Sequence, residues 1–222
     1  MIRFRFFILC MLLASQNLFA QNSNLSSDPE AAALLQKVSD KYKAYKNISA
    51  DFKLTVQRPK LKPEDDDRKY TDTLKGQIQL QGSMFNIHIN EQQIICDGKN
   101  LWTYTPSEKE VQVNYFEETD DVFSPSKIFT LYKEGYMYRI KEKAKNLTVL
   151  EMNPSNKKVS YFKIEVTINE TTQQIVESKI FEKNGTRYIY KLTKQTPNSV
   201  ITSGTFTFDE KKYPKVKVVD LR

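Results

Sequence analysis

The chain has 222 residues, of which 39% are hydrophobic and 27% are charged, and its formal net charge is +7. This length supports one domain with a sizeable core, and nothing in the composition requires two. Lysine and glutamate are interspersed along the chain, which is typical of a solvated surface and argues against nucleic-acid binding. With one histidine and two cysteines, the sequence offers no Cys/His cluster for zinc.

The N-terminus has the pattern of a secretory signal peptide. Arg3 and Arg5 supply a positive start, and an apolar run at residues 6–14 follows. This run is shorter than the ~20 residues that span a bilayer, so a permanent membrane anchor is the less favoured alternative. We expect a signal peptide at residues 1–20, export to the periplasm and a single domain at residues 21–222.

Export leaves Cys96 as the only cysteine, because Cys10 lies within the signal peptide. Cleavage before Cys10 would divide the apolar run, so a lipid-anchored protein is not expected. A single cysteine forms no internal disulfide. We expect Cys96 to be a small buried thiol in a strand.

One helix followed by many short strands is the predicted order. Ser27-Asp28-Pro29-Glu30 is a helix-start pattern, and apolar residues at helical spacing continue to about Lys46. Apolar and polar residues then alternate, which indicates strands in a large antiparallel sheet with one wet face. The predicted strands lie around residues 52–56, 74–80, 85–89, 111–113, 162–168, 188–192 and 206–208.

Two segments interrupt the strands. Ser124-Pro125 starts a second predicted helix, which ends before Gly135. Two prolines and a charge cluster between Pro59 and Thr73 predict a long exposed loop, whose acidic residues lack the spacing of a calcium site. Because long twisted antiparallel sheets curl, we expect an α+β fold, mainly β. It should be an open, incomplete antiparallel barrel whose apolar concave face is lidded by the helices.

No catalytic set is evident. His88 is the only histidine, and we expect it on the polar face of its strand rather than in a triad. The sequence has no G-x-S-x-G elbow and no glycine-rich phosphate loop. We therefore expect a binding protein rather than an enzyme, without a cofactor or a metal ion.

The most specific motif is a predicted hairpin at residues 96–106. Asp97-Gly98 lies between two apolar runs, which is a strong hairpin signal because glycine accepts the positive φ of a tight turn. Asp-Gly-Lys followed by Leu101-Trp102-x-Tyr104-x-Pro106 resembles the central hairpin of LolA-type outer-membrane lipoprotein carriers. The passage from the first helix into Asp51-Phe52 and the closing segment at residues 206–220 are similar to that family as well.

The resemblance implies a periplasmic carrier that holds the acyl chains of lipoproteins in an apolar cavity and takes them from the inner to the outer membrane. It implies acylated lipoproteins as cargo, an inner-membrane lipoprotein-releasing ABC transporter as donor, an outer-membrane receptor as acceptor, and a monomer. The family often carries an Arg-Pro step before the position of Phe85. This chain reads Gln81-Gly82-Ser83-Met84 there, so we expect the hand-over step to be tuned differently.

Candidate cavity residues are the inward-facing apolar residues of the predicted strands, although such residues can equally be core. We expect the cavity wall to contain Phe52, Leu54, Leu80, Phe85, Ile87, Trp102, Tyr104 and Val113, and the lid to contain Ile128 and Leu131. Three alternatives are weighed: an envelope sensor or lipid-binding module of the same half-barrel shape, the outer-membrane receptor of the same pathway, and a secreted hydrolase.

Overall fold

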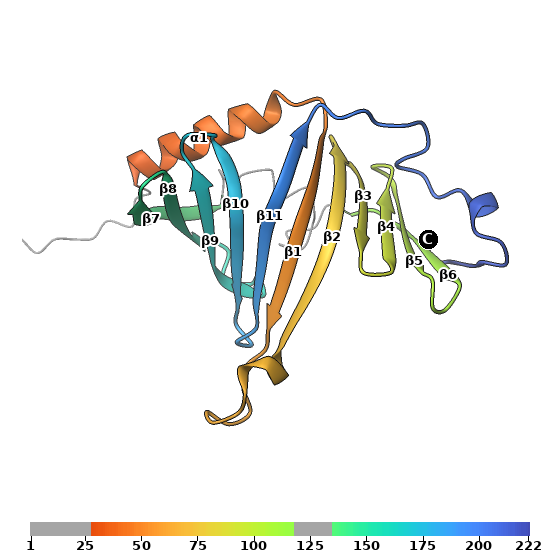
Figure 1. The fold of residues 1–222 in the computed structure, drawn as a ribbon, viewed down its shortest axis with the longest axis horizontal. Coiled ribbons are helices and arrows are strands. Elements are labelled where there is room, and N and C mark those ends of the chain that lie inside the picture. The colour runs from red at the N-terminus through yellow and green to blue at the C-terminus, as the bar shows by residue number, and fades with distance from the viewer. Residues whose placement is uncertain (1–27, 118–134) are drawn as a thin grey trace, which may run out of the picture.

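A computed structural model describes residues 28–117 and 135–222, which form one helix and one twelve-stranded sheet (Figure 1). The elements are α1 (Pro29–Lys43), β1 (Ile48–Gln57), β2 (Thr71–Gln81), β3 (Met84–Ile89), β4 (Gln92–Cys96), β5 (Asn100–Thr105), β6 (Glu110–Tyr115), β7 (Tyr136–Ala144), β8 (Leu147–Pro154), β9 (Tyr161–Asn169), β10 (Gln174–Glu182), β11 (Arg187–Pro197) and β12 (Lys217–Asp220), with short 3-10 helices at Asp67–Tyr70 and Glu210–Lys212.

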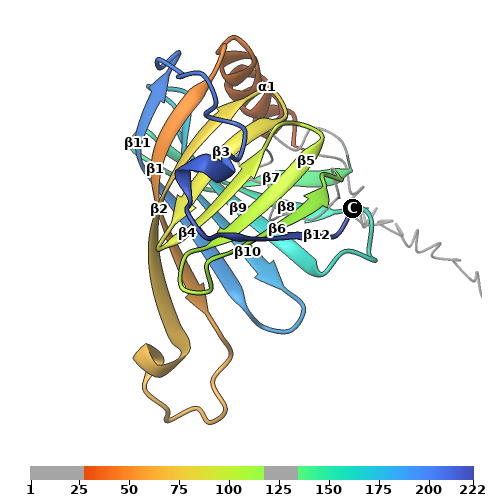
Figure 2. The ribbon, with the colours of Figure 1, turned by 90° about the vertical axis from the view of Figure 1, so that its right-hand side faces the viewer.

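The sheet is curved and unclosed (Figure 2). Its strand order is β12-β6-β5-β4-β3-β2-β1-β11-β10-β9-β8-β7, so β12 and β7 are its two edges. All neighbouring strands are antiparallel except β12, which runs parallel to β6. The expected fold, a mainly β, open and incomplete antiparallel barrel, is confirmed. No helix of the described residues is both long enough and apolar enough to cross a membrane.

Helix α1 begins where its sequence pattern predicts. The Asp28 carboxylate caps it by accepting hydrogen bonds from the backbone N–H groups of Glu30 (2.8 Å) and Ala31 (3.4 Å), and Pro29 fits the first turn because its missing N–H has no partner there anyway. The helix ends at Lys43, three residues before the expected end. It buries a single apolar face, formed by Ala31, Leu35, Val38 and Tyr42.

Helix α1 covers part of the concave face of the sheet, on the side of β7 to β11 (Figure 1). At its N-terminus, the Asp28 N–H donates to the Tyr138 carbonyl of β7 at 2.9 Å. At its C-terminus, the Tyr42 hydroxyl accepts from the Ile175 N–H of β10 at 3.1 Å and donates to Gln195 of β11 at 2.6 Å. The helix is therefore tied to the sheet at both ends.

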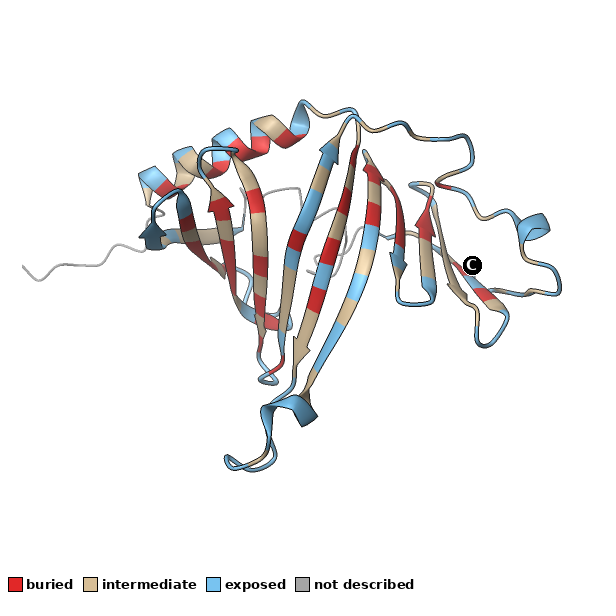
Figure 3. Cartoon of the chain, in the orientation of Figure 1, coloured by how far each residue is buried: buried red, intermediate tan, exposed pale blue. Residues whose placement is uncertain are grey.

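Pairing register assigns every strand residue to one of two faces, because directly opposite residues point to the same side. Ile48 pairs with Leu80, Leu80 with Phe85, Phe85 with Cys96, and Cys96 with Leu101. These residues point to the concave side of the sheet, where all of them except the bordering Leu101 lie in one apolar cluster with α1. Burial alternates along the central strands accordingly (Figure 3). The core thus lines the concave face of the sheet.

The order of elements agrees with the sequence prediction except in three places. No strand forms at Phe206 or Phe208, where the chain is irregular, and the last strand is β12 instead. The sequence analysis also missed β7, β8 and β10. The exposed loop after Pro59 is present, but its last residues form a 3-10 helix and β2 already begins at Thr71.

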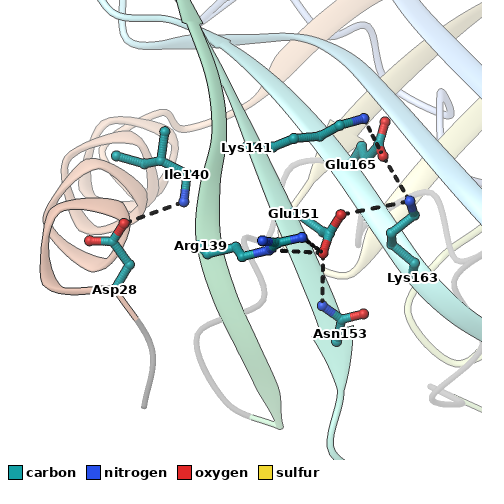
Figure 4. A network of polar contacts seen from close by, with 8 residues as sticks. All are labelled: Asp28, Arg139, Ile140, Lys141, Glu151, Asn153, Lys163 and Glu165. Atoms are coloured by element: carbon teal, nitrogen blue, oxygen red, sulfur yellow. Dashed lines mark hydrogen bonds and ion pairs between the residues drawn. The ribbon is translucent and has the colours of Figure 1, made fainter. Parts of the chain in front are cut away.

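A charged network holds β7, β8 and β9 together on the convex face (Figure 4). Glu151 and Glu165 lie directly opposite each other and are only 9% and 8% exposed. Arg139 donates to Glu151 at 2.9 Å, Lys141 donates to Glu165 at 2.7 Å, and Lys163 lies 3.0 Å from Glu165 and 3.7 Å from Glu151. Burial alone raises the pKa of both carboxyls. The hydrogen bonds from the cations outweigh burial, so each pKa lies below its ordinary value.

Candidate functional site

The Asp97-Gly98 hairpin connects β4 and β5 as predicted. Gly98 has a φ of +90°, a conformation that is accessible mainly to glycine. Asp97 accepts hydrogen bonds from the backbone N–H groups of Lys99 (2.8 Å) and Asn100 (2.6 Å). These bonds pair Cys96 with Leu101 across the hairpin, and this register decides which β5 side chains reach the concave face.

Five of the eight predicted wall residues lie together on the concave face. They are Phe52, Leu54, Leu80, Phe85 and Ile87, all of them at most 8% exposed and all in the apolar cluster that includes α1. Neighbouring strands β1, β2 and β3 supply them. These five residues thus lie close to one another, and their role as the wall of a ligand cavity stays a prediction.

The structure places the other three, Trp102, Tyr104 and Val113, on the convex face. Trp102 pairs with Ile95 and with Val113, and Tyr104 pairs with Gln93 and Val111. All of these point away from the row that contains Phe85, Cys96 and Leu101. The expectation that they share a wall with Phe85 was wrong. The hairpin turn places Leu101 at the inward-facing position, and because strand residues alternate between faces, the next residue, Trp102, points outward.

A C-terminal segment, residues 198–216, packs over this part of the convex face before the chain enters β12. Tyr104 contacts the rings of Phe208 and Tyr213, with centroid distances of 5.8 and 4.5 Å. The Tyr213 hydroxyl donates to Gln93 at 2.7 Å, and Asn86 donates to the Thr205 carbonyl at 2.6 Å. Tyr104 therefore contacts the C-terminal segment, and Trp102 lies on the same face, paired with the buried residues Ile95 and Val113 of a second, smaller core.

The concave face extends beyond the strands that α1 covers. Leu74, Ile89, Ile94 and Leu101 border the apolar cluster on β2 to β5 and are only partly buried. These side chains are aliphatic and carry no hydrogen-bonding group. Such a surface suits hydrocarbon, because dispersion contacts and burial need no directional match.

Four tyrosines border the apolar cluster on the other half of the concave face. Tyr136, Tyr138, Tyr188 and Tyr190 are partly buried against the cluster on β7 and β11. The hydroxyls of Tyr136 and Tyr161 are hydrogen-bonded to each other, and burial raises the pKa of Tyr190 above its ordinary range. The sequence analysis did not select these residues. Tyr188 and Tyr190 stood in a predicted strand, but the strand that carries Tyr136 and Tyr138 was missed.

A hollow of about 270 Å³ on the convex face is polar by contrast. Its lining includes Asp51, Gln77, Gln79, Asn86 and His88. His88 lies between Gln77 and Gln93 on the polar face of β3, as predicted. Cys96 is a buried free thiol, and burial raises its pKa. In the described part of the chain, no three His, Cys, Asp or Glu side chains gather as a metal site would require.

The predicted lid residues, Ile128 and Leu131, and the helix expected after Ser124 lie outside the described residues. Their role as a lid stays a prediction. The same holds for the predicted signal peptide at residues 1–20.

These features define a half-barrel protein: an open curved sheet with an apolar concave face beneath a helix. A crystal structure of an uncharacterized conserved protein from Thermus thermophilus has the same fold. Its TM-score is 0.54 at 11% sequence identity, over 86% of this chain and 99% of that protein.

The sequence profile of the family described as outer membrane lipoprotein carrier protein LolA matches residues 43–209. The chain therefore belongs to the LolA family of carrier proteins. It is 24% identical to the outer-membrane lipoprotein carrier protein of Shewanella sp. (strain ANA-3) over 205 residues, which cover 90% of this chain and 91% of that one. It is 31% identical to the carrier protein of the same description from Histophilus somni (strain 2336) over 147 residues, which cover 60% and 65%.

Proposed function

We propose that this protein is a periplasmic carrier that binds the acyl chains of lipoproteins on its concave face and moves them from the inner to the outer membrane. The observation that carries the proposal is the apolar concave face, which continues past α1 onto Leu74, Ile94 and Leu101. Family membership and the names of the relatives support the same role. A carrier of this kind works by binding and release, without catalysis or a cofactor.

Physical chemistry explains why such a carrier needs an apolar face. Each buried methylene contributes about 0.8 kcal/mol, so an acylated lipoprotein does not cross an aqueous compartment unshielded. The carrier must also release its cargo. Transfer is therefore decided by the difference between its affinity and that of the next acceptor.

The proposed donor is an inner-membrane lipoprotein-releasing ABC transporter, and the proposed acceptor is an outer-membrane receptor. We propose that the carrier acts as a monomer, made as a single domain after removal of residues 1–20. Phe52, Leu54, Leu80, Phe85 and Ile87 are the proposed floor of the binding face, and Ile128 and Leu131 are proposed to cover it.

Two neighbouring residues of β5 provide a matched test. Leu101→Asn should weaken binding of a fluorescent palmitoylated peptide about tenfold, because it replaces an apolar side chain on the concave face with a polar amide. Trp102→Leu should leave the dissociation constant within about twofold, although it removes the larger side chain. Fluorescence polarisation with the purified protein measures both constants.

Mass spectrometry of the protein purified from the periplasm supplies the second measurement. We expect acylated lipoprotein or lipid to copurify with the unmodified protein and to be reduced in the Leu101→Asn variant. A protein that carries no lipid and does not bind the peptide would refute the proposal. Equal loss of binding in Leu101→Asn and Trp102→Leu would refute the assignment of the concave face.

A further inference from the structure

The charge of this protein is concentrated in two segments that lie side by side. Residues 21–222 carry a formal charge of +5, which is the whole-chain charge of +7 less Arg3 and Arg5. Residues 155–163 and 179–187 together contain six cations and one acid, so they also carry +5. The rest of residues 21–222 is electrically balanced.

Both segments lie at the end of the sheet where β10 turns into β11, away from α1 (Figure 1). Phe181 pairs with Lys163 and with Arg187 across the sheet. The Lys183 N–H donates to the Ser160 carbonyl at 3.0 Å, which joins the β10–β11 turn to the β8–β9 loop. The six cations of this basic patch are Lys157, Lys158, Lys163, Lys179, Lys183 and Arg187.

Two phenylalanines form the centre of the basic patch. Three cations surround the Phe181 ring: Lys163 Nζ is 4.2 Å from the ring centroid, Lys179 Nζ is 5.2 Å from it and Arg187 Cζ is 5.6 Å from it. The Phe162 ring lies 6.1 Å away and is 50% exposed. The exposed Phe162 ring therefore lies beside a second ring that three cations surround, and this combination suits a surface that is anionic outside and apolar beneath.

Of the six cations of the basic patch, Lys163 is paired with Glu165 and Glu151 in the charged network described above, but the cations of the β10–β11 turn are not neutralised by acids of the described residues. Glu182, its one acid, is 8% exposed and accepts a hydrogen bond from Asn184 at 2.9 Å. Among residues 28–117 and 135–222, no ion pair joins a carboxylate to Lys179, Lys183 or Arg187. Lys183 Nζ donates instead to the Lys157 carbonyl at 2.6 Å, so in the described part of the chain no acid competes with an external anion for the cations of the turn.

We propose that the basic patch docks this protein on an anionic phospholipid surface, with Phe162 between the headgroups and the cations on their phosphates. The patch lies at a projecting end of the sheet (Figure 1), which suits a flat membrane better than an extended peptide that needs a groove. A second exposed apolar side chain lies at the same end: Leu61 is 85% exposed in the β1–β2 loop, whose Pro59 lies beside Gly185. Docking does not depend on the proposed carrier function, because it uses the convex face.

Vesicle cosedimentation tests the proposal with the protein from residue 21 onward. We expect binding to vesicles of phosphatidylcholine mixed with phosphatidylglycerol and much weaker binding to phosphatidylcholine alone. Each Lys or Arg near an anionic surface contributes about fivefold to partitioning. Lys183→Gln with Arg187→Gln should therefore reduce partitioning about 20- to 30-fold, and Phe162→Ser should reduce it severalfold.

The matched control is Lys37→Gln with Lys43→Gln, which removes the same charge from exposed positions on α1. We expect it to change partitioning less than twofold. Equal losses in both double variants would show a diffuse charge effect and overturn the proposal, as would the absence of binding to anionic vesicles. Retained binding of the palmitoylated peptide by the Lys183→Gln, Arg187→Gln variant shows that the protein is folded and that docking is separate from acyl binding.

Discussion

At the scale of single residues, Glu151 and Glu165 show how two like charges can lie opposite each other in a sheet. Their carboxylates would repel each other directly across β8 and β9. Arg139, Lys141 and Lys163 surround them with hydrogen bonds and charge. The ionised forms are therefore the stable ones in the folded protein, and the pKa of each carboxyl is lowered.

This arrangement predicts loss of stability in acid. Because the pKa of each carboxyl is lower in the folded than in the unfolded protein, the stabilisation is complete above the ordinary glutamate value of about 4.3. It disappears as the pH falls through the lowered value of the folded state. Glu165→Gln cannot titrate, so its melting temperature should be lower at neutral pH but should fall less between about pH 5 and pH 3.

Thermal unfolding followed by circular dichroism measures this difference. Glu108→Gln is the control, because Glu108 is exposed in the β5–β6 turn. Its melting temperature should follow the unmodified protein at every pH. An unchanged acid profile in Glu165→Gln would contradict the assignment.

At the scale of elements, a hydrogen-bonded cluster of Tyr42, Ile175 and Gln195, here termed the polar lock, holds α1 to the sheet. Tyr42 accepts from the Ile175 N–H and donates to Gln195, and the Gln195 amide donates to the Ile175 carbonyl at 2.7 Å. The pairing of β9 with β10 shifts register just after Ile175, the residue whose N–H donates to Tyr42 of the helix. The lock satisfies polar groups of the sheet that the helix would otherwise bury.

Tyr42→Phe removes this lock without changing the apolar surface of α1. We expect it to lower the free energy of unfolding by about 1–3 kcal/mol, because the buried Ile175 N–H loses its acceptor. Urea denaturation measures the change. Tyr45→Phe is the matched control, since it removes the same atom from a ring 5.6 Å away and leaves the lock intact. Equal effects of the two substitutions would contradict the role of Tyr42.

At the scale of the whole molecule, the sheet separates two apolar regions. The larger lies on the concave face with α1, and the smaller lies on the convex face beneath the C-terminal segment. The sole tryptophan, Trp102, belongs to the smaller region. Its backbone and that of its neighbours lie between its ring and the proposed acyl-binding face.

This separation predicts that the fluorescence of Trp102 does not respond to ligand binding. Binding of a palmitoylated peptide should leave the emission maximum of Trp102 unchanged. The double variant Leu101→Trp with Trp102→Phe moves the tryptophan to the concave face, and its emission should shift to the blue on binding because acyl chains exclude water. Fluorescence titration measures both. A blue shift in the unmodified protein would place the ligand on the convex face.

The sequence pattern was sufficient for the overall fold and for the Asp97-Gly98 hairpin, because both follow from local signals: alternation of apolar residues and turn chemistry. It was not sufficient for the side to which Trp102 points. That depends on how Cys96 pairs with Leu101, and a shift of one residue exchanges the two faces.

The missed strands have a similar explanation. β8 is buried on both faces over part of its length, since Leu150, Glu151 and Met152 are all buried in succession. Its sequence therefore lacks the alternation expected for a half-exposed strand. The strand predicted around Phe206 and Phe208 shows the opposite error. These residues alternate like a strand, but they pack on the convex face from an irregular segment.

The two edges of the sheet, β12 and β7, have a consequence for what the protein can enclose. The radius of a closed barrel is fixed by its strand number and stagger, because any expansion breaks hydrogen bonds. An unclosed sheet can flatten or tighten by small changes of twist along its length while every ladder stays intact. The space beneath α1 can then adjust to occupants of different girth, and one carrier can serve cargoes that differ in the number or length of their chains.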